Sequence, residues 1–133
     1  MSELTIIEIC SIVLAKFGFP NETLVSLLAK WKSFVEECAD GYGWEYSEYR
    51  NEIRSRFLIQ QLLDDERIAS NEELQDLFIE IKDTDELFRS LLQDGCVIEG
   101  ESWWDQGVLK KAGEEYRSYM KDGYGITLVM FDD

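Results

Sequence analysis

Residues 24–38 read LVSLLAKWKSFVEEC, and their apolar pattern is the basis of the fold prediction. Its apolar side chains recur with the 3.6-residue period of an α-helix. They are Leu24, Val25, Leu27, Leu28, Trp31, Phe34, Val35 and Cys38. We expect Asn21 to cap this helix and Asp40-Gly41 to end it, with Gly41 in the left-handed conformation. The segment therefore predicts an amphipathic helix with one long buried face.

Helices are also predicted on both sides of this segment. Residues 4–17 are apolar on most sides, which predicts a helix buried around most of its circumference, and Gly18-Phe19-Pro20 ends it. After the short loop 41–43, residues 45–63 predict a third helix, amphipathic in its first half and more buried in its second.

Two capping boxes are expected further along the chain. Ser70 with Glu73, and Asp83 with Glu86, have the spacing in which a side chain accepts from a free backbone N–H and an acid reaches back. Each box predicts the start of a further helix, and Asp94-Gly95 ends the run.

The last third of the chain predicts a small β element. Residues 96–98 and the apolar run 126–131 are candidate strands that could pair, and residues 108–121 predict a helix that Gly113 weakens. The expected fold class is mainly α (α+β). Five to six helices form one compact domain over residues 1–133, with a short two-stranded β element near the C-terminus.

Negative charge is concentrated in one segment. Residues 64–105 carry fourteen Asp and Glu against three Lys and Arg, which is −11 of the formal charge of −15. A chain this acidic is not expected to bind nucleic acid or an anionic membrane surface, because proteins bind both through basic residues. The longest apolar stretch, residues 6–19, contains Glu8 and Lys16 and is too short to span a bilayer. We expect a cytoplasmic protein with a basic protein partner.

Side chains typical of catalysis are scarce. The chain has no histidine, no Cys-x-x-Cys pair and no glycine-rich phosphate loop, so no catalytic, cofactor or metal residue is assigned and we expect no enzyme. Asp83-Thr84-Asp85-Glu86 begins like a calcium loop but lacks the required glycine, since Phe88 occupies that position. A hydrolase that uses carboxylates alone is the enzymatic alternative.

The three cysteines are expected to be buried thiols. Cys10 and Cys38 fall on apolar helix faces, and a disulfide between these two residues is the alternative.

Two acidic patches are the candidate partner-binding sites. Asp64, Asp65 and Glu66 follow the third predicted helix, where acids oppose the helix macrodipole. Glu99, Glu101 and Asp105 flank Trp103 and Trp104, and Asp85 completes the predicted set of partner-binding residues.

Two aromatic clusters leave alternatives open. Adjacent indoles cannot both point inward, so Trp103 and Trp104 either cover a core edge or provide a half-exposed anchor. The aromatic residues Tyr42, Trp44, Tyr46 and Tyr49 either pack in the core or lie at an interface rim.

In size, acidity and helical character the chain resembles bacterial immunity proteins of contact-dependent growth inhibition and related polymorphic toxin systems. The resemblance rests on no motif and carries over no residue. It implies an inhibitor that neutralises a basic nuclease toxin through an acidic surface. The alternatives are an acidic helical adaptor that binds basic segments and a nucleic-acid mimic that inhibits a nucleic-acid enzyme.

Overall fold

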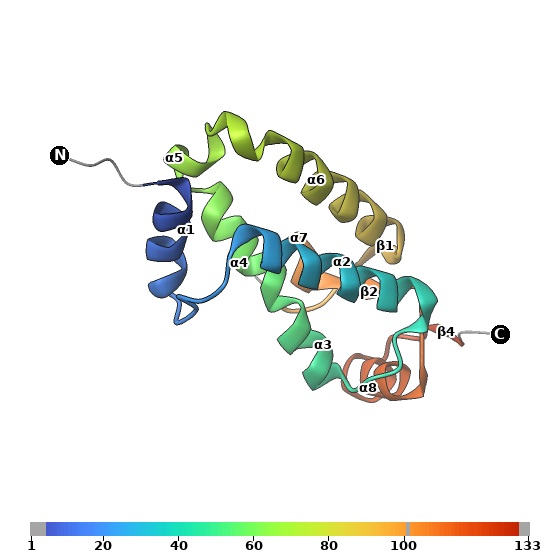
Figure 1. Cartoon of the computed structure of the whole chain (residues 1–133). Coiled ribbons are helices and arrows are strands. Elements are labelled where there is room, and N and C mark those ends of the chain that lie inside the picture. Colours follow the sequence, from blue (N-terminus) through green and yellow to red (C-terminus); the bar gives the residue numbers. More distant parts are fainter. Residues whose placement is uncertain (1–4, 101, 131–133) are drawn as a thin grey trace.

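The computed structural model describes residues 5–100 and 102–130, and Figure 1 shows a mainly α architecture. Helices make up the first two thirds of this part, and short two-stranded sheets occur near its C-terminal end. The expected fold class is confirmed.

The central helix is α2, Leu24–Gly41, which packs against both α4 and α6. Its predicted buried face is confirmed except at Val25, which is 61% exposed. Gly41 has a φ of 104°, as expected for the residue that ends the helix. The cap is Thr23 rather than Asn21, because Thr23 and Ser26 exchange side chain to backbone hydrogen bonds of 3.0 and 2.8 Å.

The first helix, α1, spans Ile6–Ala15 and packs against α4 and α5 at one end of the molecule (Figure 1). The expectation that it is buried on most sides is wrong. Only Cys10, Val13 and Leu14 are buried, whereas Ile7 is 71% exposed. The described residues bury only one face of α1, so Ile7 and Ile12 stay at the surface, whereas Ile6 and Ile9 are partly buried against the core.

The predicted third helix is divided into α3, Tyr46–Glu52, and α4, Arg54–Leu63. Ile53 joins them with helical dihedral angles, so the two segments follow one another with little change of direction. The greater burial of the second half is confirmed, because Leu58, Ile59 and Leu62 are almost fully buried.

Neither predicted capping box is present. Ser70 instead ends the short helix α5, Glu66–Ala69, and Asn71 caps the 3-10 turn η1, Glu72–Leu74. Asp83 and Glu86 lie inside one continuous helix, α6, which spans Gln75–Ser90. Their spacing and residue types suit a helix start, but the contacts with α2 keep this segment helical throughout.

The last third departs most from expectation. Its antiparallel sheet pairs β1, Leu92–Val97, with β2, Gly107–Leu109, so the first predicted strand has a different partner. The run 126–131 contributes β4, Val129–Met130, which pairs in parallel with β3, Lys111–Ala112. Phe131 lies outside the described residues. The helices of this third are α7, Trp103–Gln106, and α8, Glu114–Tyr124.

Gly113 joins this last third to the helices. Its backbone N–H donates to the Tyr42 carbonyl at 2.7 Å. A Cβ at this position would lie 2.8 Å from that oxygen and 3.1 Å from Gly43 Cα. Gly113 is therefore the N-cap of α8 and a point of close backbone approach, not a weak position within a helix.

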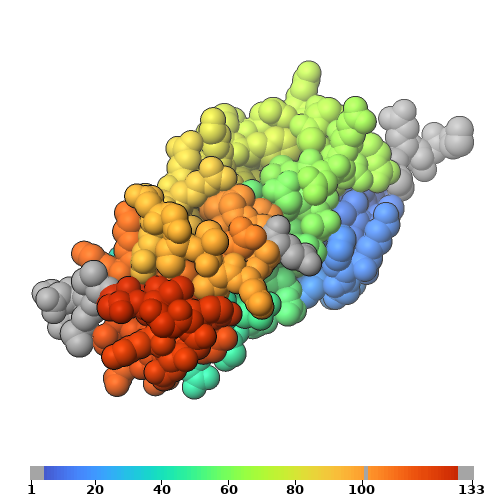
Figure 2. Space-filling model, turned by 180° about the vertical axis from the view of Figure 1, so that it is seen from behind, coloured from blue at the N-terminus to red at the C-terminus, as the bar shows by residue number. Residues whose placement is uncertain are grey.

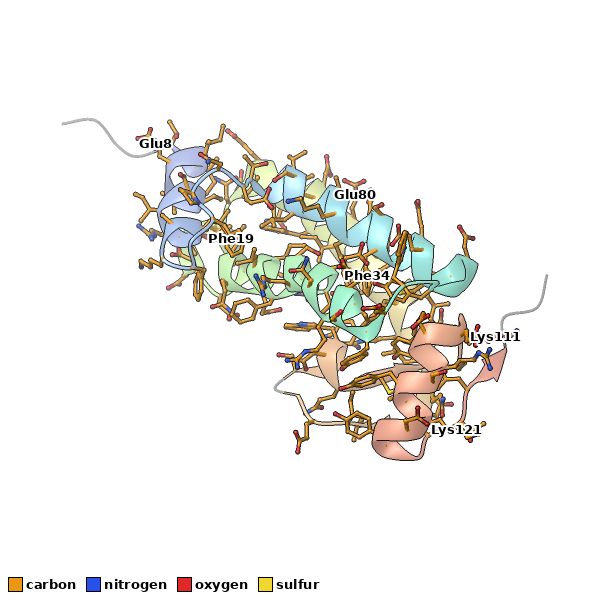
Figure 3. All side chains as sticks on the ribbon, turned by 90° about the horizontal axis from the view of Figure 1, so that it is seen from below. Glu8, Phe19, Phe34, Glu80, Lys111 and Lys121 are labelled. Carbon is orange, nitrogen blue, oxygen red and sulfur yellow. The ribbon has the colours of Figure 1, made fainter. Side chains whose placement is uncertain are left out.

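Aromatic side chains fill the core. Phe34, labelled in Figure 3, contacts the rings of Trp31, Tyr42, Tyr49 and Phe88 with centroid distances of 5.1 to 5.9 Å. The tyrosines at positions 42, 46 and 49 are buried, which confirms their core role, whereas Trp44 is 58% exposed.

All three cysteines are free thiols. Cys10 and Cys38 are buried as expected, whereas Cys96 is only half-buried. Because Cys10 and Cys38 are both free, the alternative disulfide between them is absent.

Candidate protein-interaction surface

A buried ion pair links α4 to α6. Arg56 is 4% exposed, and its Nε and Nη2 donate to the two carboxylate oxygens of Asp85 at 2.8 and 2.9 Å. Trp31 Nε1 donates to the same carboxylate at 2.9 Å. The sequence placed Asp85 at the partner interface, but these three bonds use its oxygens within the core. The structure therefore gives Asp85 a structural role.

The paired tryptophans cover the edge of this core. Trp104 is 6% exposed, and the Arg56 guanidinium lies 4.6 Å from its ring centroid. Trp103 is half-buried, with the Arg89 guanidinium 4.0 Å from its ring centroid. Both indoles thus bind cations of the chain itself. The core-edge interpretation is favoured over an anchor surrounded by free acids.

Two of the acids around the tryptophans, Asp105 and Glu99, have different surroundings. Asp105 forms a capping box with Ser102, whose N–H donates to Asp105 Oδ1 at 2.9 Å. Glu99 is exposed on the surface. Glu101 lies outside the described residues.

The other predicted patch, Asp64 to Glu66, lies between two helices. Asp65 is the N-cap of α5 and accepts from the Arg67 backbone N–H at 3.0 Å. The Arg67 guanidinium also bonds this carboxylate, which lowers the pKa of Asp65. Glu66 occupies the first turn of α5, where a negative charge interacts favourably with the helix macrodipole. The predicted conflict with the macrodipole is therefore wrong for both residues, although Asp64 does follow the end of α4.

A larger acidic surface lies on α6, where the sequence had predicted helix caps. Its acids are exposed and none of them makes a hydrogen bond or ion pair through its side chain within the described residues. They are Glu72 and Glu73 of η1 and Asp76, Asp83 and Glu86 of α6. Two aliphatic side chains lie among them, Ile79 at 58% and Leu87 at 46% exposure. We call these seven residues the acidic α6 face.

The spacing of these residues in the sequence could have predicted that they share one helix face. Positions 72, 76, 79, 83 and 86 alternate steps of four and three, which places side chains on one face of a continuous helix. On the side of α6 that faces α2, Glu80 is not free, because it forms an ion pair with Lys32 of α2.

The η1 end of the acidic α6 face lies far from Lys111 and Lys121 of the C-terminal third. In Figure 3, Glu8 lies at one end of the molecule, whereas Lys111 and Lys121 lie at the other. Figure 2 shows α6 as the yellow-green edge that leads from the α5 region toward the C-terminal third. The η1 end of this face is therefore the end that lies farther from Lys111 and Lys121.

Among the described residues that line a cleft of about 400 Å³ between α2 and α3–α4, no free pair of acids is available for catalysis. Among its lining residues, Glu22 pairs with Lys30, and Glu52 accepts a 2.7 Å hydrogen bond from the Tyr42 hydroxyl. Both carboxylates are thus engaged by neighbouring side chains. Across the described residues, no group of His, Cys, Asp and Glu is arranged to hold a metal ion.

The chain matches no protein-family model, no curated protein and no solved structure. Among its described helices, none combines the length and apolar character needed to cross a bilayer. The fold and the acidic α6 face define a small helical protein with an exposed acidic and aliphatic surface.

Proposed function

We propose that this protein is a cytoplasmic inhibitor of the immunity-protein kind, which binds and neutralises a basic enzyme, foremost a nuclease toxin, through the acidic α6 face. The observation that supports this proposal is the combination of five exposed acids, unpaired within the described residues, with two exposed aliphatic side chains along η1 and α6.

The electrostatics favour this kind of partner. A nuclease needs a basic cleft to hold phosphate, and an acidic surface attracts such a cleft and accelerates encounter. Because Asp76, Asp83 and Glu86 have no partner within the described residues, they can pair with lysine or arginine without breaking an existing contact. Ile79 and Leu87 supply apolar contact area between the charges.

The surface is also held in place by contacts with neighbouring helices. Helix α6 packs along α2, and the Arg56–Asp85 pair fastens it to α4. A preorganised face loses little conformational freedom on binding, which favours affinity for the partner.

A charge-reversal experiment tests this function. Asp76→Lys, Asp83→Lys and Glu86→Lys are combined, and the matched control combines Asp40→Lys, Glu45→Lys and Glu48→Lys at exposed positions elsewhere. The probe is the basic C-terminal domain of a toxin encoded beside this protein, measured by surface plasmon resonance and by rescue of growth.

We expect the α6 variant to lose rescue and at least about a hundredfold in affinity, as for the loss of several charged contacts. The control, which has the same net charge, should still rescue growth. Binding by the parent protein should weaken as salt rises from about 0.05 M to about 0.3 M. Equal behaviour of the two variants, or binding that ignores salt, would contradict the proposed function.

A further inference from the structure

An apolar groove lies beside the acidic α6 face, where α1, the start of α2 and the η1–α6 junction meet. Its volume is about 310 Å³. The side chains that line it include Ile7, Cys10, Pro20, Val25, Leu74 and Leu77. Ile7 is 71% exposed and Val25 is 61% exposed, although both are large aliphatic residues. Exposed aliphatic side chains around a hollow mark a binding site for apolar groups.

The η1–α6 edge of the groove is acidic. Among the described residues that line the groove there is no lysine or arginine, and Glu22, the one charged side chain among them, is paired with Lys30. Glu72, Glu73 and Asp76 flank Leu74 and Leu77 in η1 and α6, and their side chains are exposed and unpaired within the described residues.

The α1 side of the groove differs, because its acid is engaged. Glu8 follows the lining residue Ile7, and Figure 3 places it at this end of the molecule. Its carboxylate accepts hydrogen bonds from the Thr5 N–H and hydroxyl at 3.2 and 3.0 Å. An occupant of the groove therefore meets aliphatic side chains below and the exposed carboxylates of η1 and the start of α6 along one edge.

We propose that the groove binds the apolar side of a basic amphipathic helix supplied by the partner protein. This inference rests on the proposed function and names the partner's secondary structure and chemistry. Aliphatic side chains at positions i, i+3 or i+4, and i+7 enter the groove, and lysine or arginine on the helix flanks meets the carboxylates. Charge complementarity selects this occupant over an acidic or neutral helix.

The probe is a synthetic helix of about 18 residues made only of leucine and lysine, with the leucines on one face. Its control has the same composition, with the leucines scattered around the helix. Binding is measured by isothermal titration calorimetry and by backbone NMR shifts. The groove variant Ile7→Ser with Val25→Ser is compared with a control variant, Ile12→Ser with Val97→Ser, which removes two exposed aliphatic side chains that neither line the groove nor belong to the acidic α6 face.

We expect the groove variant to bind the amphipathic peptide about tenfold less tightly, the effect of losing central apolar contacts, and the control variant to change by less than about twofold. NMR shifts should follow the groove residues. The peptide with scattered leucines should bind more weakly than the amphipathic one.

Other outcomes separate the two proposals. If the control variant weakens binding as much as the groove variant, or both peptides bind equally, the groove is not the docking site although an acidic interface survives. If neither peptide binds and affinity for the toxin domain ignores salt, the proposed function fails as well. If the parent protein dimerises in analytical ultracentrifugation and the groove variant does not, a second copy of the chain occupies the groove and the inference is overturned.

Discussion

Arg56 and Asp85, 29 residues apart in the sequence, form a two-point ion pair in the protein interior that joins α4 to α6. Trp31 donates to the same carboxylate from α2, and Trp104 covers the guanidinium from α7. Four elements therefore meet at one pair of charges, which makes this site sensitive to substitution.

Removal of one charge of this pair should strongly destabilise the fold. We expect Arg56→Met or Asp85→Asn to lower the free energy of unfolding by about 3–5 kcal/mol, because the remaining buried group loses its partner. Urea denaturation followed by circular dichroism measures the change. The exposed pair Lys32–Glu80 is the matched control, and Lys32→Ala should lower stability by about 1 kcal/mol or less.

A double variant distinguishes pairing from packing. Arg56→Leu combined with Asp85→Leu removes both charges, so it should be less destabilising than the sum of the two single leucine variants. If the single effects simply add, the two side chains do not act as a pair.

The two tryptophans should differ in their contributions to stability. Trp104→Ala should cost about 3–5 kcal/mol, because this indole is buried and covers Arg56. Trp103 is half-buried, so Trp103→Ala should cost less. Thermal unfolding of both variants tests the order, and an equal or larger loss at Trp103 would show that the core edge is centred there instead.

Gly113 should not tolerate a methyl group. Gly113→Ala places Cβ against the backbone of residues 42 and 43, which cannot yield as a side chain does, so we expect a loss of about 1–3 kcal/mol. At Gly123, within α8, an added Cβ would meet no atom within 4 Å. There, Gly123→Ala should stabilise by about 0.5–1 kcal/mol. Denaturant midpoints of the two variants should therefore move in opposite directions.

Stability should fall in alkaline solution because of the buried tyrosines. Burial is the main cause that raises the pKa of Tyr46 to about 12, from an ordinary value of 10.0, and it raises the pKa of Tyr49 and Tyr116 as well. In the unfolded chain these phenols ionise at a lower pH than in the folded protein. Their contribution to the free energy of unfolding is therefore complete below pH 10 and is lost as the pH rises from 10 to about 12.

Absorbance of the phenolates together with circular dichroism should follow this loss. Part of the tyrosine titration should coincide with unfolding, and Tyr46→Phe should reduce the part of the pH dependence that lies between pH 10 and about 12. Ionisation of all six tyrosines near pH 10 in the folded protein would contradict the burial of this cluster.

Periodicity predicted the parts of the fold that depend on one helix face. The apolar positions of residues 24–38 identified the face of α2 that packs between α4 and α6, because burial follows the 3.6-residue period. Residues 45–63 were correctly predicted as helical, apart from the change at Ile53. In both segments the local pattern and the tertiary contacts agree.

The errors arose where distant contacts decide the outcome. The spacing of Asp83 and Glu86 suits a helix start, yet contacts with α2 carry α6 through both residues. Asp85 looked like any other acid of the segment, because nothing in the local sequence relates it to Arg56. Residues 107–112 form short strands rather than helix because their partners lie in β1 and β4.

The Gly113–Tyr42 hydrogen bond also bears on the order in which the chain folds. It joins positions 71 residues apart, whereas α2, α4 and α6 find one another over shorter separations. Short-range contacts form faster than long-range ones, and a chain emerges from the ribosome with its N-terminal part first. The helices can therefore assemble during synthesis, before the segment that contains Gly113 docks against Tyr42.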